Sequence, residues 1–262
     1  MAENITQGTT MAKLPTSRWR ATSIEGYEIQ AVEFGSGDDV LVLLHGLSGS
    51  SRWWMRNVPA LADRFRLLVP DLVGFGRTRY DGTLPSPAEL AKLLVRWMAE
   101  LGANRAHVAG HSMGGQIAIH LAAANPACVD RLVLVDAAGI PRPRTPAHLL
   151  RFAADIAPIW RWGDPRFLPV IMGDAVRAGP RTIARAAAHI LDDDVRPLLS
   201  QIQSPTLIVW GDRDRWVPVA HASEFRQRLP NATMAVLPRA GHNPMVDQPE
   251  EFNKLVLGFL DD

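Results

Sequence analysis

The chain has 262 residues, of which 47% are hydrophobic and 21% charged, and its formal net charge is +1. This is the composition of a globular protein with one large or two small domains, and the charge gives no reason to expect nucleic acid or an acidic membrane as a partner. The single cysteine, Cys128, excludes an internal disulfide and a cysteine-based metal site, and it fits a cytoplasmic location. No stretch has the roughly 18 uncharged apolar residues that a membrane span needs.

The N-terminal part of the chain has two predicted sections. Residues 1–16 are polar and lack the apolar block of a signal peptide, so we expect a flexible lead-in. Residues 18–39 alternate around Glu25 and Gly26, which predicts an antiparallel hairpin with its turn at that pair.

Beyond the hairpin, apolar runs without alternation are typical of strands covered on both faces. Helical patterns lie between them, and the one at residues 86–102 begins at a capping serine and ends at a glycine. The predicted fold class is therefore α/β: an open, mostly parallel sheet of the eight-stranded type, flanked by helices. The apolar runs are 40–46, 65–71, 105–110, 131–139, 204–212 and 232–242.

Residues 140–203, which we call the cap segment, interrupt this alternation. The segment has no clear strand and carries Trp160 and Trp162 among nine arginines. It could be additional scaffold, but it enters just past the carboxyl end of a predicted strand, where α/β sheets bind their ligands. We therefore expect a helical lid, with a core formed by residues 17–139 and 204–262.

The sequence Gly110-His111-Ser112-Met113-Gly114 fits the pattern G-x-S-x-G between a predicted strand and a predicted helix. Such a turn holds its serine in a strained conformation, so the flanking positions must be glycine. The amides at the start of the following helix face the same point and favour a developing anion. Ser112 is therefore the candidate nucleophile.

A serine nucleophile needs a base, and a neutral imidazole needs an acid that fixes its tautomer. His242 lies in a loop after the last predicted strand and is the candidate base. Asp214 follows the preceding strand and is the candidate acid, while its neighbour Asp212 is expected to shape the turn through backbone amides. Asp136, at the end of an earlier strand, is the less favoured alternative acid.

An oxyanion hole requires two backbone donors at the same edge of the sheet. The amide of Met113 follows the nucleophile, and that of Leu47 follows the His-Gly pair after an early strand. Trp53, Trp54 and Trp216 are candidate pocket residues, although the first two could equally begin a core helix. No residue set calls for a metal or a cofactor.

The chain has Ser112, Asp214 and His242 in that order, a serine turn flanked by glycines (the elbow), a His-Gly loop and an inserted cap. With these features it resembles the α/β-hydrolase superfamily, in its esterase- and lipase-like form, over residues of about 20–262. The resemblance implies a serine hydrolase that cleaves a small to medium, mainly apolar carboxylic ester through an acyl-enzyme. It implies a small-molecule substrate and leaves the oligomeric state open.

Several relatives of this fold remain alternatives. A serine at position 112 argues against dehalogenases and epoxide hydrolases, which resemble the chain but use aspartate there. Carbon–carbon bond hydrolases of aromatic breakdown products use serine, but their elbow commonly reads Gly-Asn-Ser, and an aromatic residue often follows the histidine where this chain has Asn243. Cofactor-free haloperoxidase-like or perhydrolase-like esterases share the triad. The alternative that is not an enzyme is a ligand receptor with the same fold, whose turnover of substrate would be negligible.

Overall fold

The computed structural model describes residues 15–141, 145, 150, 154 and 163–261. Most of the predicted lead-in lies outside these residues, and so do Trp160 and Trp162 of the cap segment.

The predicted N-terminal hairpin is confirmed. Strands β1 (Ser17–Ile24) and β2 (Tyr27–Phe34) pair antiparallel. Glu25 and Gly26 form the turn with φ values of +48° and +85°, the positive values that suit the twist of a two-residue hairpin.

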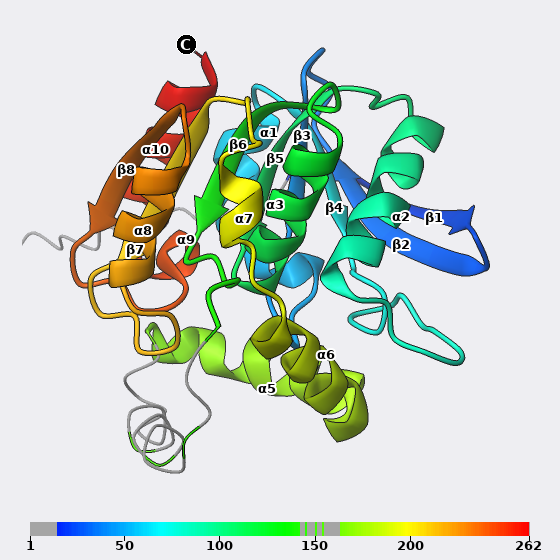
Figure 1. Ribbon diagram of the computed structural model, residues 1–262. Helices are drawn as coiled ribbons and strands as arrows, with labels where there is room; N and C mark the ends of the chain where they lie inside the picture. Colours follow the sequence, from blue (N-terminus) through cyan, green and yellow to red (C-terminus); the bar gives the residue numbers. More distant parts are fainter. Residues whose placement is uncertain (1–14, 142–144, 146–149, 151–153, 155–162, 262) are drawn as a thin grey trace, which may run out of the picture.

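The central sheet has eight strands in the order β1-β2-β4-β3-β5-β6-β7-β8 (Figure 1). Only the β1–β2 and β2–β4 pairs are antiparallel, so the prediction of an open, mostly parallel sheet is confirmed. The strands after the hairpin are buried almost throughout, except for the edge strand β8, which explains their unbroken apolar runs. They are β3 (Val40–Leu44), β4 (Arg66–Pro70), β5 (Ala106–His111), β6 (Val129–Val135), β7 (Thr206–Gly211) and β8 (Ala232–Leu237).

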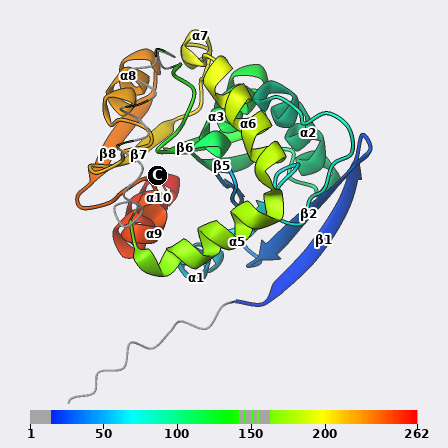
Figure 2. The same ribbon diagram turned by 90° about the horizontal axis from the view of Figure 1, so that it is seen from below.

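Helices cover both faces of the sheet, and each face has its own apolar cluster (Figure 2). One face carries α2 (Pro87–Glu100), α3 (Met113–Ala124), α7 (Arg196–Leu199) and α8 (Ala220–Arg228). The other carries the 3₁₀ turn η1 (Ser51–Trp54), α1 (Val58–Ala62), α9 (Pro244–Asp247) and α10 (Pro249–Asp261).

Helix α2 shows how local sequence sets these elements. The Ser86 hydroxyl accepts a hydrogen bond from the Glu89 amide, while the Glu89 carboxylate accepts one from the Ser86 amide, and Pro87 occupies the first helical turn. The chain leaves the helix at Gly102, whose φ is +72°. The predicted start and end are both confirmed.

The described part of the cap segment contains helices and no strand. A 3₁₀ turn, η3 (Pro165–Phe167), leads into α5 (Leu168–Ala178), and a corner at Gly179 with φ +79° leads into α6 (Pro180–Asp192). Figure 1 places α5 and α6 beyond the carboxyl ends of the parallel strands.

Asp174 ties this segment to the core. Its side chain is 2% exposed and accepts hydrogen bonds from Ser50 Oγ at 2.7 Å and Trp53 Nε1 at 3.1 Å, and Arg52 lies 3.4 Å away. A buried carboxylate is costly unless several donors compensate it, and these donors all come from the chain after β3. Helix α5 is therefore seated directly on that loop.

Candidate active site

Adjacent parallel strands bring the candidate residues to one edge of the sheet. Ser112 follows β5 and Asp214 follows β7, and His242 lies in the loop after β8. Strand β6 lies between β5 and β7, and all these parallel strands end at one edge, so residues far apart in sequence meet there.

Ser112 occupies the sharp turn that its sequence context predicts. Its φ of +52° and ψ of −115° are strained for a residue with a side chain. A Cβ atom at Gly110 would lie 2.4 Å from the Gly114 carbonyl oxygen, and one at Gly114 would lie 2.5 Å from the Leu44 carbonyl oxygen. Both flanking positions therefore require glycine, because the turn packs backbone against backbone.

The three candidate side chains form a continuous hydrogen-bonded chain. His242 Nε2 lies 3.1 Å from Ser112 Oγ, and His242 Nδ1 lies 2.8 Å from Asp214 Oδ2. Because a carboxylate only accepts, the Nδ1 atom carries the proton and Nε2 is free to accept the proton of the serine hydroxyl. The Asp214 side chain is fully buried, whereas that of His242 is 12% exposed.

The turn that holds Asp214 is formed differently from the sequence-based expectation. Asp214 Oδ1 itself accepts the backbone amides of Trp216 at 2.7 Å and Val217 at 3.0 Å. The side chain of Asp212 is 41% exposed beside Arg213, and no hydrogen bond to a backbone amide is found for it among the described residues. The expectation for Asp212 is therefore wrong: the carboxylate that faces His242 also shapes its own turn.

Two further histidines are buried around the site and hold its loops. His45 Nδ1 donates to the Gly46 carbonyl oxygen at 2.8 Å, and its Nε2 accepts the Leu72 amide at 2.9 Å. His111 Nε2 donates to the carbonyl oxygen of His242 at 2.7 Å. Burial lowers the pKa of His45, and burial together with the nearby His242 ring holds the pKa of His111 well below its ordinary value.

The loop after β3 lies against the nucleophile. A Cβ atom at Gly46 would be 3.1 Å from Ser112 Cβ, so the loop that carries Leu47 reaches the elbow itself. Within the described residues, no acceptor is found for the backbone amides of Leu47 and Met113. Two unused amides next to one serine hydroxyl are what an oxyanion would require.

The three predicted pocket tryptophans have different surroundings. Trp53 is 5% exposed, and its ring centroid lies 5.6 Å from that of His111. The Trp216 ring lies 6.2 Å from the His242 ring, at the site. Trp54 is fully buried and packs against Phe252 of α10, so it fills the core and presents no surface to a substrate.

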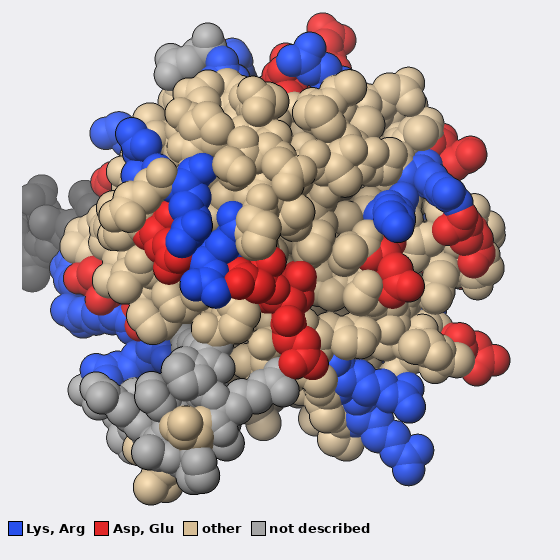
Figure 3. All heavy atoms as spheres, viewed as in Figure 1, with Lys and Arg blue, Asp and Glu red and all other residues tan. Residues whose placement is uncertain are grey.

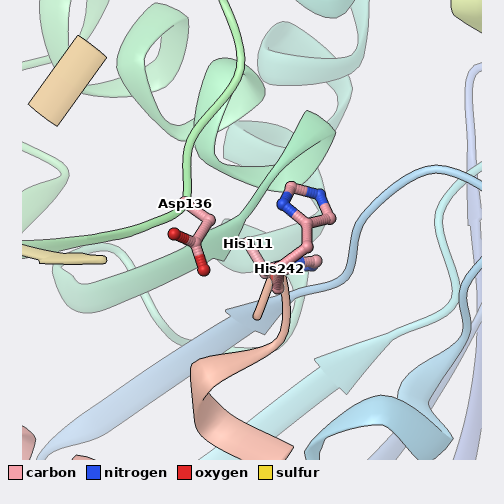
Figure 4. A group of neighbouring side chains, drawn as sticks. All are labelled: His111, Asp136 and His242. Atoms are coloured by element: carbon pink, nitrogen blue, oxygen red, sulfur yellow. The ribbon is translucent and has the colours of Figure 1, made fainter. Parts of the chain in front are cut away.

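Asp136, which the sequence made the less favoured candidate acid, also lies at the site. It follows β6, between the strands that precede Ser112 and Asp214, and its side chain is fully buried. Figure 4 shows it beside His111 and His242, and one polar atom of each lies within 4.8 Å of the others. Sequence order alone could not reveal this, because the contact depends on β6 lying next to both β5 and β7.

These three side chains do not form a good cation site. His242 already uses both ring nitrogens, toward Asp214 and Ser112, and His111 Nε2 is used by the His242 carbonyl oxygen. A cation bound by all three residues would have to break the hydrogen bonds that His242 makes with Asp214 and Ser112.

A comparison with protein families assigns the class. The sequence profile described as "Alpha/beta hydrolase family" matches residues 41–255. The chain therefore belongs to the alpha/beta hydrolase family, and the protein is a hydrolase. No helix in the described ranges is both long and apolar enough to cross a membrane.

Individual relatives differ in the substrate that their names specify. A "Putative carbamate hydrolase RutD" of Caulobacter sp. (strain K31) is 31% identical, over 86% of this chain and 91% of that protein. A 2-hydroxy-6-oxononadienedioate/2-hydroxy-6-oxononatrienedioate hydrolase of Burkholderia vietnamiensis (strain G4 / LMG 22486) is 29% identical, over 94% of this chain and 96% of that protein. A further relative, from Pseudomonas putida, is 31% identical and longer, and the chain spans 64% of its length.

A solved structure adds a third chemistry. The structure titled "Est816 as an N-Acyl homoserine lactone degrading enzyme" superposes with a TM-score of 0.81 at 25% identity, over 92% of this chain and all of that one. The Caulobacter and Burkholderia relatives are both named hydrolases and differ in substrate, whereas the Pseudomonas putida relative is named a dihydrolipoyllysine-residue acetyltransferase component of an acetoin cleaving system.

Proposed function

We propose that the protein is a serine hydrolase of carboxylic esters that works through an acyl-enzyme. The hydrogen-bonded chain from Ser112 Oγ through His242 to Asp214, with distances of 3.1 Å and 2.8 Å, is the observation that carries this proposal. The named activity of the lactone-degrading structural relative supports it, since a lactone is a cyclic ester.

In the proposed reaction, Ser112 Oγ attacks the ester carbonyl carbon while His242 Nε2 takes the hydroxyl proton. Asp214 keeps the imidazole in the required tautomer and stabilises its charged form. The amides of Leu47 and Met113 bind the oxyanion of the tetrahedral intermediate. His242 then returns the proton to the departing alcohol, and a water molecule activated by His242 hydrolyses the acyl-enzyme.

The same proposal assigns residues 140–203 as a cap over the site and residues 17–139 and 204–262 as the catalytic core. The seating of Asp174 on Ser50 and Trp53 supports a cap that is held against the loop of Leu47. Trp53 and Trp216 would line the acyl or alcohol pocket. Action in the cytoplasm, without a cofactor, is part of the proposal, and the single cysteine supports that compartment.

A carbon–carbon bond hydrolase is the second candidate, because the Burkholderia relative, which is named a hydrolase of 2-hydroxy-6-oxononadienedioate, aligns over nearly the whole of both chains. A carbamate hydrolase would use the same geometry with a different acyl group, as the name of the Caulobacter relative suggests. The three candidates differ in the substrate bond that breaks after Ser112 has attacked the carbonyl carbon.

The test combines active-site labelling with turnover on purified protein. The panel contains p-nitrophenyl esters graded by acyl length, a carbamate and a vinylogous 1,5-diketone acid. We expect a fluorophosphonate probe to label the wild type, esters to turn over fastest, and Ser112→Ala to abolish both signals while remaining folded. Fastest turnover of the diketone acid or the carbamate would replace the ester assignment. Labelling with negligible turnover of the whole panel would indicate a ligand receptor.

A further inference from the structure

The backbone of Asp136 sets this residue apart at the carboxyl edge of the sheet. Its φ of +41° lies in the left-handed region, which residues other than glycine seldom adopt. The Asp136 amide donates to the Val209 carbonyl oxygen at 3.0 Å, and its Oδ1 atom accepts the Gly211 amide at 3.0 Å. The residue is thus held from both ends against β7, the strand that leads to Asp214.

The second carboxyl oxygen of Asp136 has an unusual neighbour. Oδ2 is buried, and no donor reaches it among the described residues. The negative charge of Asp214 acts on this carboxyl group, and both acids lie at the His242 ring. Two carboxyl groups can share a hydrogen bond only if one of them carries a proton, because an ionised carboxylate has no donor.

The surroundings decide which group carries that proton. Asp214 already accepts His242 Nδ1–H and the two backbone amides of Trp216 and Val217, three donors that favour its ionised form. Asp136 accepts a single amide and is fully buried. Burial, followed by the negative charge of Asp214, raises the pKa of Asp136 well above its ordinary value.

The other titratable groups that face Asp136 come from the neighbouring loops. His111 ends β5, and His242 and Asp247 belong to the segment after β8. Asp247 adds a further negative influence, which also favours the protonated form of Asp136, and His111 stays neutral because its pKa is low. Arg56 offsets part of the charge of Asp247, but among the described residues no cation is found against the Asp136 carboxyl group itself, so a second ionised carboxylate has no compensation at this position.

We propose that Asp136 is a positioning residue that remains a neutral carboxylic acid and donates its proton in a hydrogen bond to the Asp214 carboxylate. This rests on the proposed function, in which Asp214 orients His242. The bond fixes the carboxylate between Asp136 and His242 Nδ1 and withdraws part of its negative charge. Asp214 therefore stabilises the charged imidazole less than an unbonded carboxylate would, and the proton stays on Asp136 throughout turnover.

The test compares Asp136→Asn with Asp136→Leu. Asparagine keeps both an acceptor for the Gly211 amide and an N–H donor for Asp214, whereas leucine keeps the volume and removes both. We expect Asp136→Asn to retain kcat/KM within about 3-fold, with an unchanged acid limb of the pH–rate profile. In Asp136→Leu we expect kcat to fall at least about 10-fold, and the midpoint of the acid limb to rise by about half a pH unit, because the unbonded Asp214 stabilises protonated His242 more strongly.

A matched control is Asp130→Asn, which removes a carboxyl group from the opposite end of β6, where Asp130 faces Arg105 and His107. We expect it to leave the pH profile unchanged. Equal profiles for Asp136→Asn and Asp136→Leu would overturn the proposal, since the donor would then have no influence. Loss of activity in Asp136→Asn to the level of Asp136→Leu would also overturn it, because an ionised Asp136 would then be required.

A second measurement does not depend on turnover. An infrared difference spectrum of wild type minus Asp136→Asn at neutral pH should contain the C=O stretching band of a protonated carboxyl group. A spectrum without that band would overturn the proposal, even if Asp136→Leu fails to fold. If the wild type hydrolyses no substrate on the panel, the proposed function fails, while the band still decides the protonation of Asp136.

Discussion

The Nε2–H group of His111 donates a hydrogen bond of 2.7 Å to the backbone carbonyl oxygen of His242. The residue before the candidate nucleophile therefore holds the main chain of the candidate base. The His111 ring also packs against Trp53, at 5.6 Å, and against the His242 ring, at 4.8 Å. Through this one side chain, the elbow and the last loop of the protein are fixed relative to each other.

The first prediction follows from that bond. His111→Phe keeps a ring but removes the donor, so the His242 loop loses an anchor and we expect kcat to fall by about 10-fold or more, with a smaller change in KM. His111→Gln restores an N–H donor and should recover part of the loss. Steady-state kinetics on a short ester measure both variants, and equal activity of His111→Phe and wild type would contradict the role.

The second prediction concerns stability at acid pH. The pKa values of His111 and His45 are lowered in the folded protein, chiefly by burial, whereas the unfolded chain titrates near 6.5. As pH falls below about 6.5 the unfolded state binds protons that the folded state does not, so the free energy of unfolding decreases, by up to about 1.4 kcal/mol per pH unit for each group. Urea unfolding from pH 7.5 to 5 measures this slope, and His111→Gln should reduce it.

The third prediction concerns the seating of the cap segment. Asp174→Ala leaves the donors of Ser50 and Trp53 without their acceptor in a buried place, which we expect to cost about 1–3 kcal/mol of stability. The control is Arg177→Ala, which truncates an exposed side chain near the end of the same helix, α5, and should leave stability nearly unchanged. Thermal unfolding compares the two variants, and an unchanged Tm for Asp174→Ala would contradict the anchoring role.

The fourth prediction separates two glycines by the space around them. A methyl group at Gly110 would lie 2.4 Å from the Gly114 carbonyl oxygen, so Gly110→Ala should destabilise the protein by about 1–3 kcal/mol or prevent folding. Gly258 lies within α10, where a methyl group would meet no neighbouring atom within 4 Å, so Gly258→Ala should stabilise by about 0.5–1 kcal/mol. Denaturant unfolding measures both variants. A Gly110→Ala variant as stable as the wild type would contradict the close backbone packing at the elbow.

Charge on the molecular surface adds little to these arguments. Lys and Arg side chains are interspersed with Asp and Glu over the core in the view of Figure 3, in keeping with the net charge of +1. The functional predictions therefore depend on buried groups at the sheet edge, where water screens charge least.

The sequence alone was sufficient for the elements whose signals are local. The Glu25-Gly26 turn, the capped helix that begins after Ser86 and the glycine-flanked elbow at Ser112 follow from backbone conformations that few residues adopt. The fold class followed as well, because strands buried on both faces need unbroken apolar runs.

Tertiary structure decided everything that depends on which strands are neighbours. The influence of the Asp214 charge on Asp136 acts between residues 78 positions apart, and the bond from His111 to the His242 carbonyl oxygen joins residues 131 positions apart. The hydrogen bond from Trp53 to Asp174 joins residues 121 positions apart. Asp136 and Asp214 each follow an apolar strand, so sequence could treat them only as alternatives. Because β6 lies beside β7, the two carboxyl groups instead lie in one buried region, and the number of donors to each decides which of them keeps its proton.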